Sequence, residues 1–267
     1  ADADGALSQA EATVDGWLNR YRALPGLYAR DPRLLEAMKG APEAGTLPAL
    51  GRELAAWNDI AGTLDTYVMA LDGTTVAASN SGDPLSFVGR NFGFRPYFTD
   101  AMTGRPGRFF GLGITSGLRG YYLSAPIRDA SGILGVVVVK VSIPALEATL
   151  SESAHPMFVS DDADVVILST LPDLRLTALT DMPREMEAIV EDTRRYDLAT
   201  IPPAPLEVVG DRQDGWPRLR APAAARPDET RTYLAPHRAV PDAGWSLHLL
   251  YDTAGIRQQL WMLAATL

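Results

Sequence analysis

The sequence contains no cysteine, and this absence removes several kinds of chemistry at once. A chain without thiols has no disulfide framework, no thiolate nucleophile and no zinc–thiolate site. The three histidines, His155, His237 and His248, also lack any spacing typical of metal ligands. No Ser-His-Asp order or pair of carboxylates stands out either. We therefore expect no metal, no cofactor and no catalytic residue, whereas the redox compartment stays open.

Lysine is scarce as well, because Lys39 and Lys140 are the only two. With 24 basic and 33 acidic side chains the formal net charge is -9, which argues against a nucleic-acid partner. An anionic ligand would have to be drawn by a local basic pocket. A hydrophobic content of 46% with 21% charged residues is typical of a folded globular protein. The 267 residues suffice for one large domain or two of about 130 residues.

Long apolar runs are missing too, since none reaches the length of about 18 residues that a membrane-spanning helix needs. The chain starts at Ala1 without methionine or a signal peptide, and it ends in the apolar run "LWMLAATL", Leu260 to Leu267. We interpret it as a piece of a longer chain whose C-terminal helix was entering a membrane. The alternative is a buried C-terminal helix of a complete domain.

Hydrophobic periodicity predicts that the N-terminal quarter is helical. Apolar residues recur at helical spacing from about Leu7, with a possible bend at Pro25-Gly26. Asp31-Pro32 supplies an N-cap and a proline at the first position of a second helix, which should stop at Gly40. A third helix is expected over about Leu47 to Ile60.

From Thr66 onward the pattern becomes that of short strands. "TYVMALDGTTVAAS" predicts two strands around a turn at Asp72-Gly73, and a short helix should cover Pro96 to Met102. Three strands are then expected in "GRFFGLG", "GYYLSAPI" and "GILGVVVVKVS". The sequence thus predicts an α+β module with a five-stranded, mostly antiparallel meander that ends near Ile143.

The second half of the chain repeats this theme more weakly. A linking helix is predicted over Pro144 to Glu152, followed by strand, acidic turn and strand in "PMFVSDDADVVILST". The acidic turn "SDDAD", Ser160 to Asp164, lacks the glycine and glutamate of a calcium loop and fits an Asx-type hairpin turn better. A helix near Arg184 to Thr193, a proline-rich loop and strands in "TRTYLAPHRAV" and "GWSLHLLYD" complete a second α+β module.

The segment "VGRNFGFRPYFTDAMTG" places Arg90 and Arg95 among aromatic residues just before a helix that Pro96 opens. A guanidinium presents a rigid fork of donors that matches two carboxylate oxygens, and the free N–H groups of a helix start also favour an anion. The alternative is a pair of surface arginines lying over aromatic rings. Thr115, Ser116 and Gly117 follow in "GLGITSGLRGYYLS" and offer further donors, unless this is an ordinary hairpin.

Lys140 interrupts the apolar strand "GVVVVKV". Strand alternation puts it on the face of Val136 and Val138, where an unpaired ammonium group would cost several kcal/mol. Its strand should lie beside the one that carries Tyr121 to Ser124. Lys140 could then face a cavity bordered by the two arginines and Thr115-Ser116, and a ligand carboxylate would pair with it. The alternative is a lysine whose stem packs while its head reaches water.

These segments resemble a known family. "GRNFGFRPYF", "GRFFGLGITSGLRGYYLSAP" and "GILGVVVVKVSIPALE" are similar to the extracytoplasmic sensor region of C4-dicarboxylate sensor histidine kinases of the DctB type, which are double Cache, or tandem PAS-like, sensors. "LPGLYARDPRLLEAM" and "VSDDADVVILST" fit the same pattern. The resemblance implies a helical stalk over 1–45, a membrane-distal ligand-binding module over 46–146, a membrane-proximal module over 147–250 and a C-terminal helix leading towards the membrane over 251–267.

The resemblance also implies a function and a site. The distal module would bind succinate, fumarate, malate or a similar acid, and the proximal module would carry no ligand. This chain would not be an enzyme but the periplasmic region of an inner-membrane histidine kinase of a two-component system, homodimeric along its N-terminal helix. Phe92 stands where some relatives are expected to have a tyrosine. The implied ligand-binding residues are Arg90, Arg95, Tyr97, Thr115, Ser116, Gly117, Tyr122 and Lys140.

Two other functions stay open at this point. A double Cache domain could bind an amino acid or another carboxylate, but the ammonium group of an amino acid needs an acidic partner. Near the basic set the sequence offers only Asp100 and Asp129, which fit helix and turn positions. An enzyme acting on organic acids could use Lys140 as a base or Schiff-base former, but it would lack a paired acid or metal site.

Overall fold

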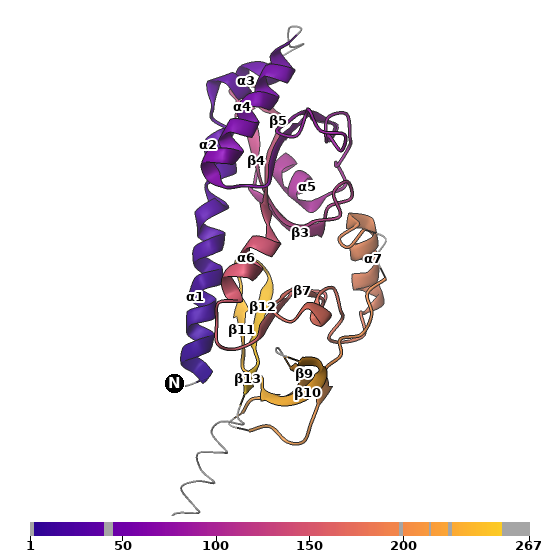
Figure 1. Ribbon diagram of the computed structural model, residues 1–267. Helices are drawn as coiled ribbons and strands as arrows, with labels where there is room; N and C mark the ends of the chain where they lie inside the picture. Colours follow the sequence, from indigo (N-terminus) through magenta and orange to yellow (C-terminus); the bar gives the residue numbers. More distant parts are fainter. Residues whose placement is uncertain (1–2, 40–44, 198–199, 214, 224–225, 253–267) are drawn as a thin grey trace, which may run out of the picture. The chain divides into compact units, whose positions relative to one another are not determined.

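The computed structural model describes residues 3–39, 45–197, 200–213, 215–223 and 226–252 (Figure 1). Contacts divide the chain into two compact units, neither of which is continuous in sequence. We call Leu18–Ile143 with Glu185–Ala199 unit A, and Ala1–Trp17, Pro144–Arg184 and Thr200–Leu267 unit B.

The N-terminal quarter is helical, as the periodicity predicts. Its helices are α1 (Ala3–Arg22), α2 (Leu24–Tyr28), α3 (Pro32–Met38) and α4 (Thr46–Ala61). The predicted bend is a break, because α1 ends at Arg22 and α2 begins one residue before Pro25. The predicted N-cap of α3 is confirmed, since the Asp31 carboxylate accepts a hydrogen bond of 2.9 Å from the backbone N–H of Arg33.

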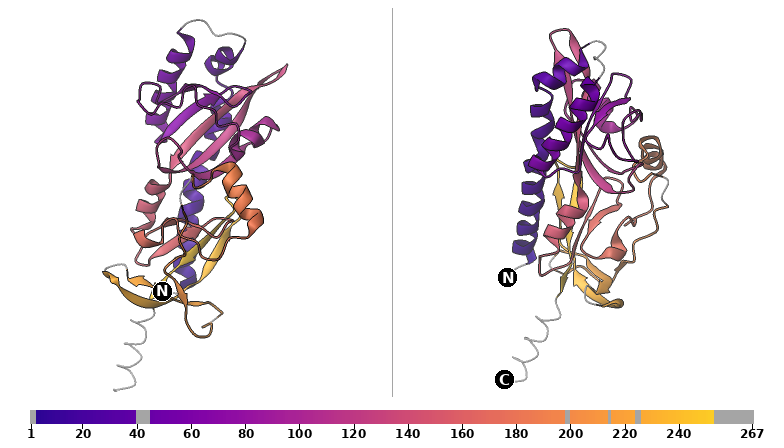
Figure 2. Two further views of the ribbon diagram at one scale, coloured as in Figure 1. Left: turned by 90° about the vertical axis from the view of Figure 1, so that its right-hand side faces the viewer. Right: turned by 45° about the horizontal axis from the view of Figure 1, so that its top comes forward.

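Unit A is built around one antiparallel sheet of five strands, which the left view of Figure 2 shows side by side. The strands are β1 (Asp65–Met69), β2 (Thr75–Ala78), β3 (Gly107–Leu112), β4 (Arg119–Asp129) and β5 (Gly132–Ser142), in the spatial order β2-β1-β5-β4-β3. The predicted meander is therefore wrong in topology, because β5 inserts between β1 and β4. The valine-rich β5 is buried on both faces, and a central place in the sheet provides this burial.

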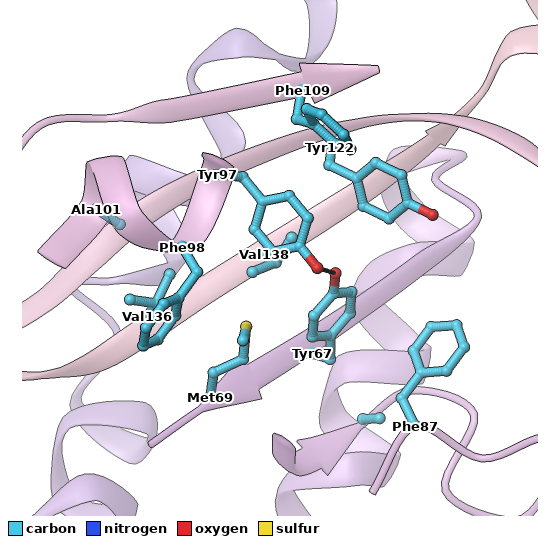
Figure 3. Packing of buried hydrophobic residues seen from close by; sticks show 11 residues of the cluster. Tyr67, Met69, Phe87, Tyr97, Phe98, Ala101, Phe109, Tyr122, Val136 and Val138 are labelled. Atoms are coloured by element: carbon cyan, nitrogen blue, oxygen red, sulfur yellow. Dashed lines mark hydrogen bonds between the residues drawn. The ribbon is translucent and has the colours of Figure 1, made fainter. Parts of the chain in front are cut away.

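The two faces of this sheet are covered by different elements. The predicted helix α5 (Pro96–Met102) packs on one face, where Val136 and Val138 join an aromatic cluster shown in Figure 3. Val137 points to the opposite face, where it packs with residues of α3 and α4. The alternation predicted for β5 is thus confirmed.

Unit B contains two antiparallel sheets of four strands each among the described residues. The first has the order β11-β12-β6-β7 and the second the order β13-β10-β9-β8. Helix α6 (Ile143–Leu150) precedes β6, and the 3-10 helix η1 (Pro172–Leu174) follows β7. The strands are β6 (Met157–Ser160), β7 (Val166–Ser169), β8 (Glu207–Val208), β9 (Arg218–Ala223), β10 (Arg226–Leu234), β11 (His237–Val240), β12 (Trp245–Leu249) and β13 (Tyr251–Asp252). The predicted α+β class, with antiparallel sheets in both halves of the chain, is confirmed.

Strand β8 begins at the last residue of the predicted proline-rich loop "TIPPAPLE", and β9 lies in a later stretch for which the sequence predicted no strand. Helix α7 (Arg184–Thr193), in contrast, has the predicted bounds, and most of it belongs to unit A. The acidic turn between β6 and β7 is the predicted Asx-type turn, because the Asp161 carboxylate accepts hydrogen bonds from the N–H groups of Ala163 and Val165 at 3.0 and 3.2 Å.

In the part of the chain that the structure describes, no helix has both the length and the apolar character needed to cross a membrane. The C-terminal run from Leu260 to Leu267, and the helix expected over 251–267 beyond Asp252, lie outside the described residues. The same part of the chain contains no cluster of three or more acidic or histidine side chains that could hold a metal ion.

Candidate functional site

A small cavity lies in unit A on the α5 side of the sheet. Its volume of about 20 Å³ leaves room for about one water molecule. Aromatic rings form much of the wall, and the loop between β3 and β4 closes one side. The lining residues are Tyr67, Phe87, Phe92, Arg95, Tyr97, Gly113, Ile114, Thr115, Ser116 and Tyr122.

Arg95 lines this cavity and is the N-cap residue of α5, directly before Pro96. Its backbone is extended, and its carbonyl accepts the first helical hydrogen bonds, including one of 2.9 Å from the N–H of Phe98. Only 3% of Arg95 is exposed. The guanidinium lies 5.1 Å from the ring centroid of Phe109, and its Nη2 donates to the carbonyl of Leu112 at 3.1 Å. Arg95 is thus stacked on an aromatic ring and also buried.

Two polar groups of the cavity have no hydrogen-bond partner among the described residues. They are Nη1 of Arg95 and Oγ1 of Thr115, and both atoms are buried. Leaving such a group unsatisfied costs about 1 to 3 kcal/mol, and more if it is charged. Burial lowers the pKa of Arg95, but a guanidinium stays protonated in proteins. The cavity therefore presents a positive charge and a hydroxyl group that an anion could satisfy.

Lys140 lies at the Ser116 end of the same cavity. Its side chain is fully buried, and its Nζ donates to Oγ of Ser116 at 3.0 Å. Tyr122 is its cross-strand neighbour in β4, as the sequence predicts. The head of this lysine does not reach water, so the snorkelling alternative is wrong.

No local pattern in the sequence indicates that Lys140 has an acidic neighbour. Oδ2 of Asp65 lies 3.8 Å from its Nζ, which is an ion-pair distance but long for a hydrogen bond. Burial lowers the pKa of Lys140, and the charge of Asp65 works against this change. A ligand is therefore not the sole possible partner of this ammonium group, and this corrects the expectation drawn from strand β5 alone.

Three tyrosines form the floor of the cavity, and Figure 3 shows how they lie. The hydroxyl groups of Tyr67 and Tyr97 share a hydrogen bond of 2.8 Å, and the ring of Tyr97 stacks on that of Tyr122 with centroids 5.2 Å apart. Burial raises the pKa of Tyr97 to about 12 and also raises that of Tyr67 and Tyr122. The phenols therefore stay neutral and can donate hydrogen bonds.

Two of the predicted site residues lie elsewhere. Arg90 is exposed, and its Nε donates to the carbonyl of Ser86 at 3.0 Å. Gly117 belongs to the loop between β3 and β4 but not to the cavity lining, and its φ of +65° serves the loop's turn. The structure brings together Arg95, Tyr97, Thr115, Ser116, Tyr122 and Lys140. The lining also contains five residues outside the predicted set, which are Tyr67, Phe87, Phe92, Gly113 and Ile114.

Comparison with solved structures first shows which fold the chain has. The sensory domain of the Campylobacter jejuni chemoreceptor Tlp3, solved with isoleucine bound, superposes with a TM-score of 0.59 at 15% identity, over 94% of this chain and 91% of that one. At this identity the likeness shows the fold alone, which this chain shares with that sensory domain. No family model matches the sequence.

Three proteins with higher sequence identity show a more specific likeness. The sensor domain of the Vibrio cholerae histidine kinase DctB superposes with a TM-score of 0.82 at 28% identity, over 93% of this chain and 95% of that one. Over 238 residues, 89% of this chain, the sequence is 35% identical to the C4-dicarboxylate transport sensor protein DctB of Pseudomonas aeruginosa. The protein of the same name from Rhizobium meliloti is 31% identical over 254 residues, 93% of this chain.

These findings confirm the resemblance to DctB-type sensors. The chain spans 35% and 40% of the length of the two curated relatives. Because the match covers 95% of the Vibrio cholerae domain, the chain corresponds to the sensor domain of such proteins.

Proposed function

We propose that this chain is the periplasmic sensor domain of an inner-membrane histidine kinase and binds a small C4-dicarboxylate, such as succinate, fumarate or malate, in the cavity of unit A. One observation carries the proposal. Buried Arg95 and Thr115 both present atoms without a partner to the same cavity, which fits a ligand that supplies acceptors. The names of the Pseudomonas aeruginosa and Rhizobium meliloti relatives support the choice of a C4-dicarboxylate.

The two ends of the cavity suit the two ends of such a ligand. One carboxylate would meet the guanidinium of Arg95 and the hydroxyl of Thr115, where charge-assisted hydrogen bonds are strongest. The other would meet the ammonium group of Lys140 and the hydroxyl of Ser116, which already contact each other. The apolar carbons between them would lie against the rings of Tyr97 and Tyr122.

The cavity has to grow to admit a four-carbon acid, because it now has room for about one water. The loop between β3 and β4 carries Thr115 and Ser116 and is closed by a hydrogen bond of 3.0 Å from Gly113 N–H to the Leu118 carbonyl. We propose that this loop rearranges around the ligand. A signal then requires only that the ligand binds one arrangement better than the other.

The remaining parts of the proposal concern the longer protein. Helices that flank the described part of the chain would attach the domain to the membrane, and the full-length protein would be a homodimer that passes the signal to its kinase. The net charge of -9 gives a nucleic acid no general attraction.

An amino acid is a second candidate ligand, and Asp65 favours it. Asp65 is an acid close to the basic set, and the sequence analysis did not find one there. It could accept a hydrogen bond from an α-ammonium group. The fold shared with the isoleucine-bound chemoreceptor domain is compatible with this ligand class.

Titration calorimetry and melting curves against a panel of acids would test the proposal. Succinate, fumarate and malate should bind, and each should add about 2.7 kcal/mol of stability at 100 times its dissociation constant. Butyrate, which lacks the second carboxylate, should bind more weakly by about 1.5 to 3 kcal/mol. Equal affinities for succinate and butyrate would contradict the proposal. Tight binding of isoleucine, without binding of the diacids, would favour the second candidate.

A further inference from the structure

Asp65 holds a place in the site that the proposed function does not explain. It is the first residue of β1, and its direct cross-strand partner in the sheet is Lys140. Because residues two apart share a face, Asp65 lies on the same side of the sheet as Tyr67, which lines the cavity. Its side chain is 15% exposed, whereas that of Lys140 is fully buried.

The groups that face Asp65 come from several elements. Lys140 on β5 is the positive one, at 3.8 Å. Asp83, in the exposed segment after β2, adds negative charge, and Tyr122 on β4 is a neutral phenol. Burial raises the pKa of Asp65, Lys140 lowers it and Asp83 raises it, and together they bring the pKa to about 6. Arg95 is the next positive charge and acts on Lys140.

The charges at the site do not balance when a dicarboxylate enters. Arg95 and Lys140 each contribute one positive charge and Asp65 one negative charge, so the site carries a net charge of about +1. A doubly ionised ligand would bring the total to about -1. An uncompensated charge in a buried site is costly, and a carboxylate there takes up a proton instead.

We propose that Asp65 is the counter-ion of Lys140 in the ligand-free protein and takes up one proton from solvent when a dicarboxylate binds. The ligand carboxylate replaces Asp65 as the partner of the ammonium group, and no other bond forms or breaks. Asp65 is thus a positioning residue that acts through Lys140 and makes dicarboxylate binding proton-linked. This inference rests on the proposed function.

The proposal predicts how affinity depends on pH. Where Asp65 is ionised without ligand and protonated with it, uptake of one proton makes the dissociation constant rise about tenfold per pH unit. Fumarate is a suitable probe, because its carboxyl groups are stronger acids than those of succinate and stay ionised over more of the range. Calorimetry of fumarate binding between about pH 6 and about pH 8, in buffers of different ionisation enthalpy, also measures the protons taken up per ligand.

Two variants separate this role from a structural one. Asp65→Asn imitates the protonated carboxyl group, so its fumarate affinity should be independent of pH and, at the upper end of the range, higher than that of the wild type. Asp83→Asn is the matched control, because it removes the exposed carboxylate and should keep the pH dependence of the wild type.

The outcomes are distinct. Wild-type fumarate binding with no proton uptake and no pH dependence overturns the inference, and this measurement decides even if Asp65→Asn does not fold. An Asp65→Asn variant that weakens binding equally at every pH also overturns it, because that is the result of a merely structural role. If none of the diacids of the panel binds at any pH, the proposed function itself fails.

Discussion

The hydroxyl groups of Tyr67 and Tyr97 meet at 2.8 Å beneath the cavity, although one residue belongs to β1 and the other to α5. Both side chains are almost completely buried, at 1% and 2% exposed. Two phenols that share one hydrogen bond keep a second proton to donate. This pair therefore joins the helix to the sheet and also leaves a donor close to the cavity.

Replacing Tyr97 by phenylalanine should lower the free energy of unfolding by about 1 to 3 kcal/mol. The ring still packs on Tyr122, but the buried hydroxyl of Tyr67 loses its partner. Urea unfolding of the variant measures the effect. The double variant Tyr67→Phe/Tyr97→Phe is the control, since it leaves no unsatisfied hydroxyl and should recover part of the loss. A single variant as stable as the wild type would show that the hydrogen bond contributes nothing.

Arg95 and Arg90 provide a matched pair of variants. Arg95→Gln should weaken succinate binding by at least about 1.5 to 3 kcal/mol, because a buried charged contact is removed. Arg90→Gln should leave the affinity close to that of the wild type, since this side chain is exposed and bonded to the carbonyl of Ser86. Titration calorimetry measures the succinate affinity of both variants and of the wild type. A large loss with Arg90→Gln would support the sequence-based prediction that Arg90 contacts the ligand.

Lys140→Met should abolish most dicarboxylate binding and make stability depend on pH. Without the ammonium group, buried Asp65 keeps a pKa above its ordinary value of 3.8. A folded-state pKa above the unfolded one adds stability at low pH that is lost as the pH rises through the folded-state value. The variant should therefore match the wild type near about pH 5 and be less stable near about pH 8.

Melting curves at the two pH values measure this difference. The double variant Lys140→Met/Asp65→Asn removes both charges and should lose the pH dependence. Unchanged succinate affinity in Lys140→Met would remove this lysine from the site.

In unit B, His248 should make stability fall in acid. Its ring stacks on Phe158 with centroids 4.5 Å apart, and burial lowers its pKa to about 4, with a smaller effect from His237. In the unfolded chain the His248 imidazole binds a proton with its ordinary pKa of 6.5, whereas in the folded chain its pKa is about 4. Stability is complete above the higher value and falls by up to roughly 3 kcal/mol as the pH drops towards the lower one.

Urea unfolding of His248→Phe at about pH 7.5 and about pH 5 checks this, with His155→Gln as the control. The loss in acid should be smaller in His248→Phe than in the wild type and unchanged in His155→Gln. Equal losses in all three proteins would contradict the prediction.

The parts of the fold that depend on local patterns could be predicted from the sequence. Pro96 and the apolar spacing that follows define α5, and strand alternation placed Lys140 on the cavity side of β5 and beside Tyr122. The predicted order of the strands failed because pairing of β1 with β5 joins segments far apart in the sequence. That same pairing brings Asp65 to Lys140, so no local signal could have indicated the ion pair.

The two arginines show a second limit. Arg90 and Arg95 are close in sequence, but the chain between them is tied to the β1–β2 hairpin by a hydrogen bond of 3.0 Å from Phe92 N–H to the Gly73 carbonyl. This loop turns one guanidinium into the cavity and leaves the other at the surface. Spacing in a loop does not determine the direction of a side chain, whereas spacing in a strand does.

The discontinuous course of unit A restricts how the protein can be divided. Strand β3 is an edge of the sheet, and the N–H of Leu112 at its end donates to the carbonyl of Arg195 at 2.7 Å, while the ring of Tyr196 lies 6.4 Å from that of Phe110. A fragment that stops at Ile143 would leave this end of the edge strand uncovered, which invites pairing with other chains. Unit A is thus not one continuous segment of the chain. A chimaera that exchanges it between two relatives would have to carry 185–199 along with 18–143.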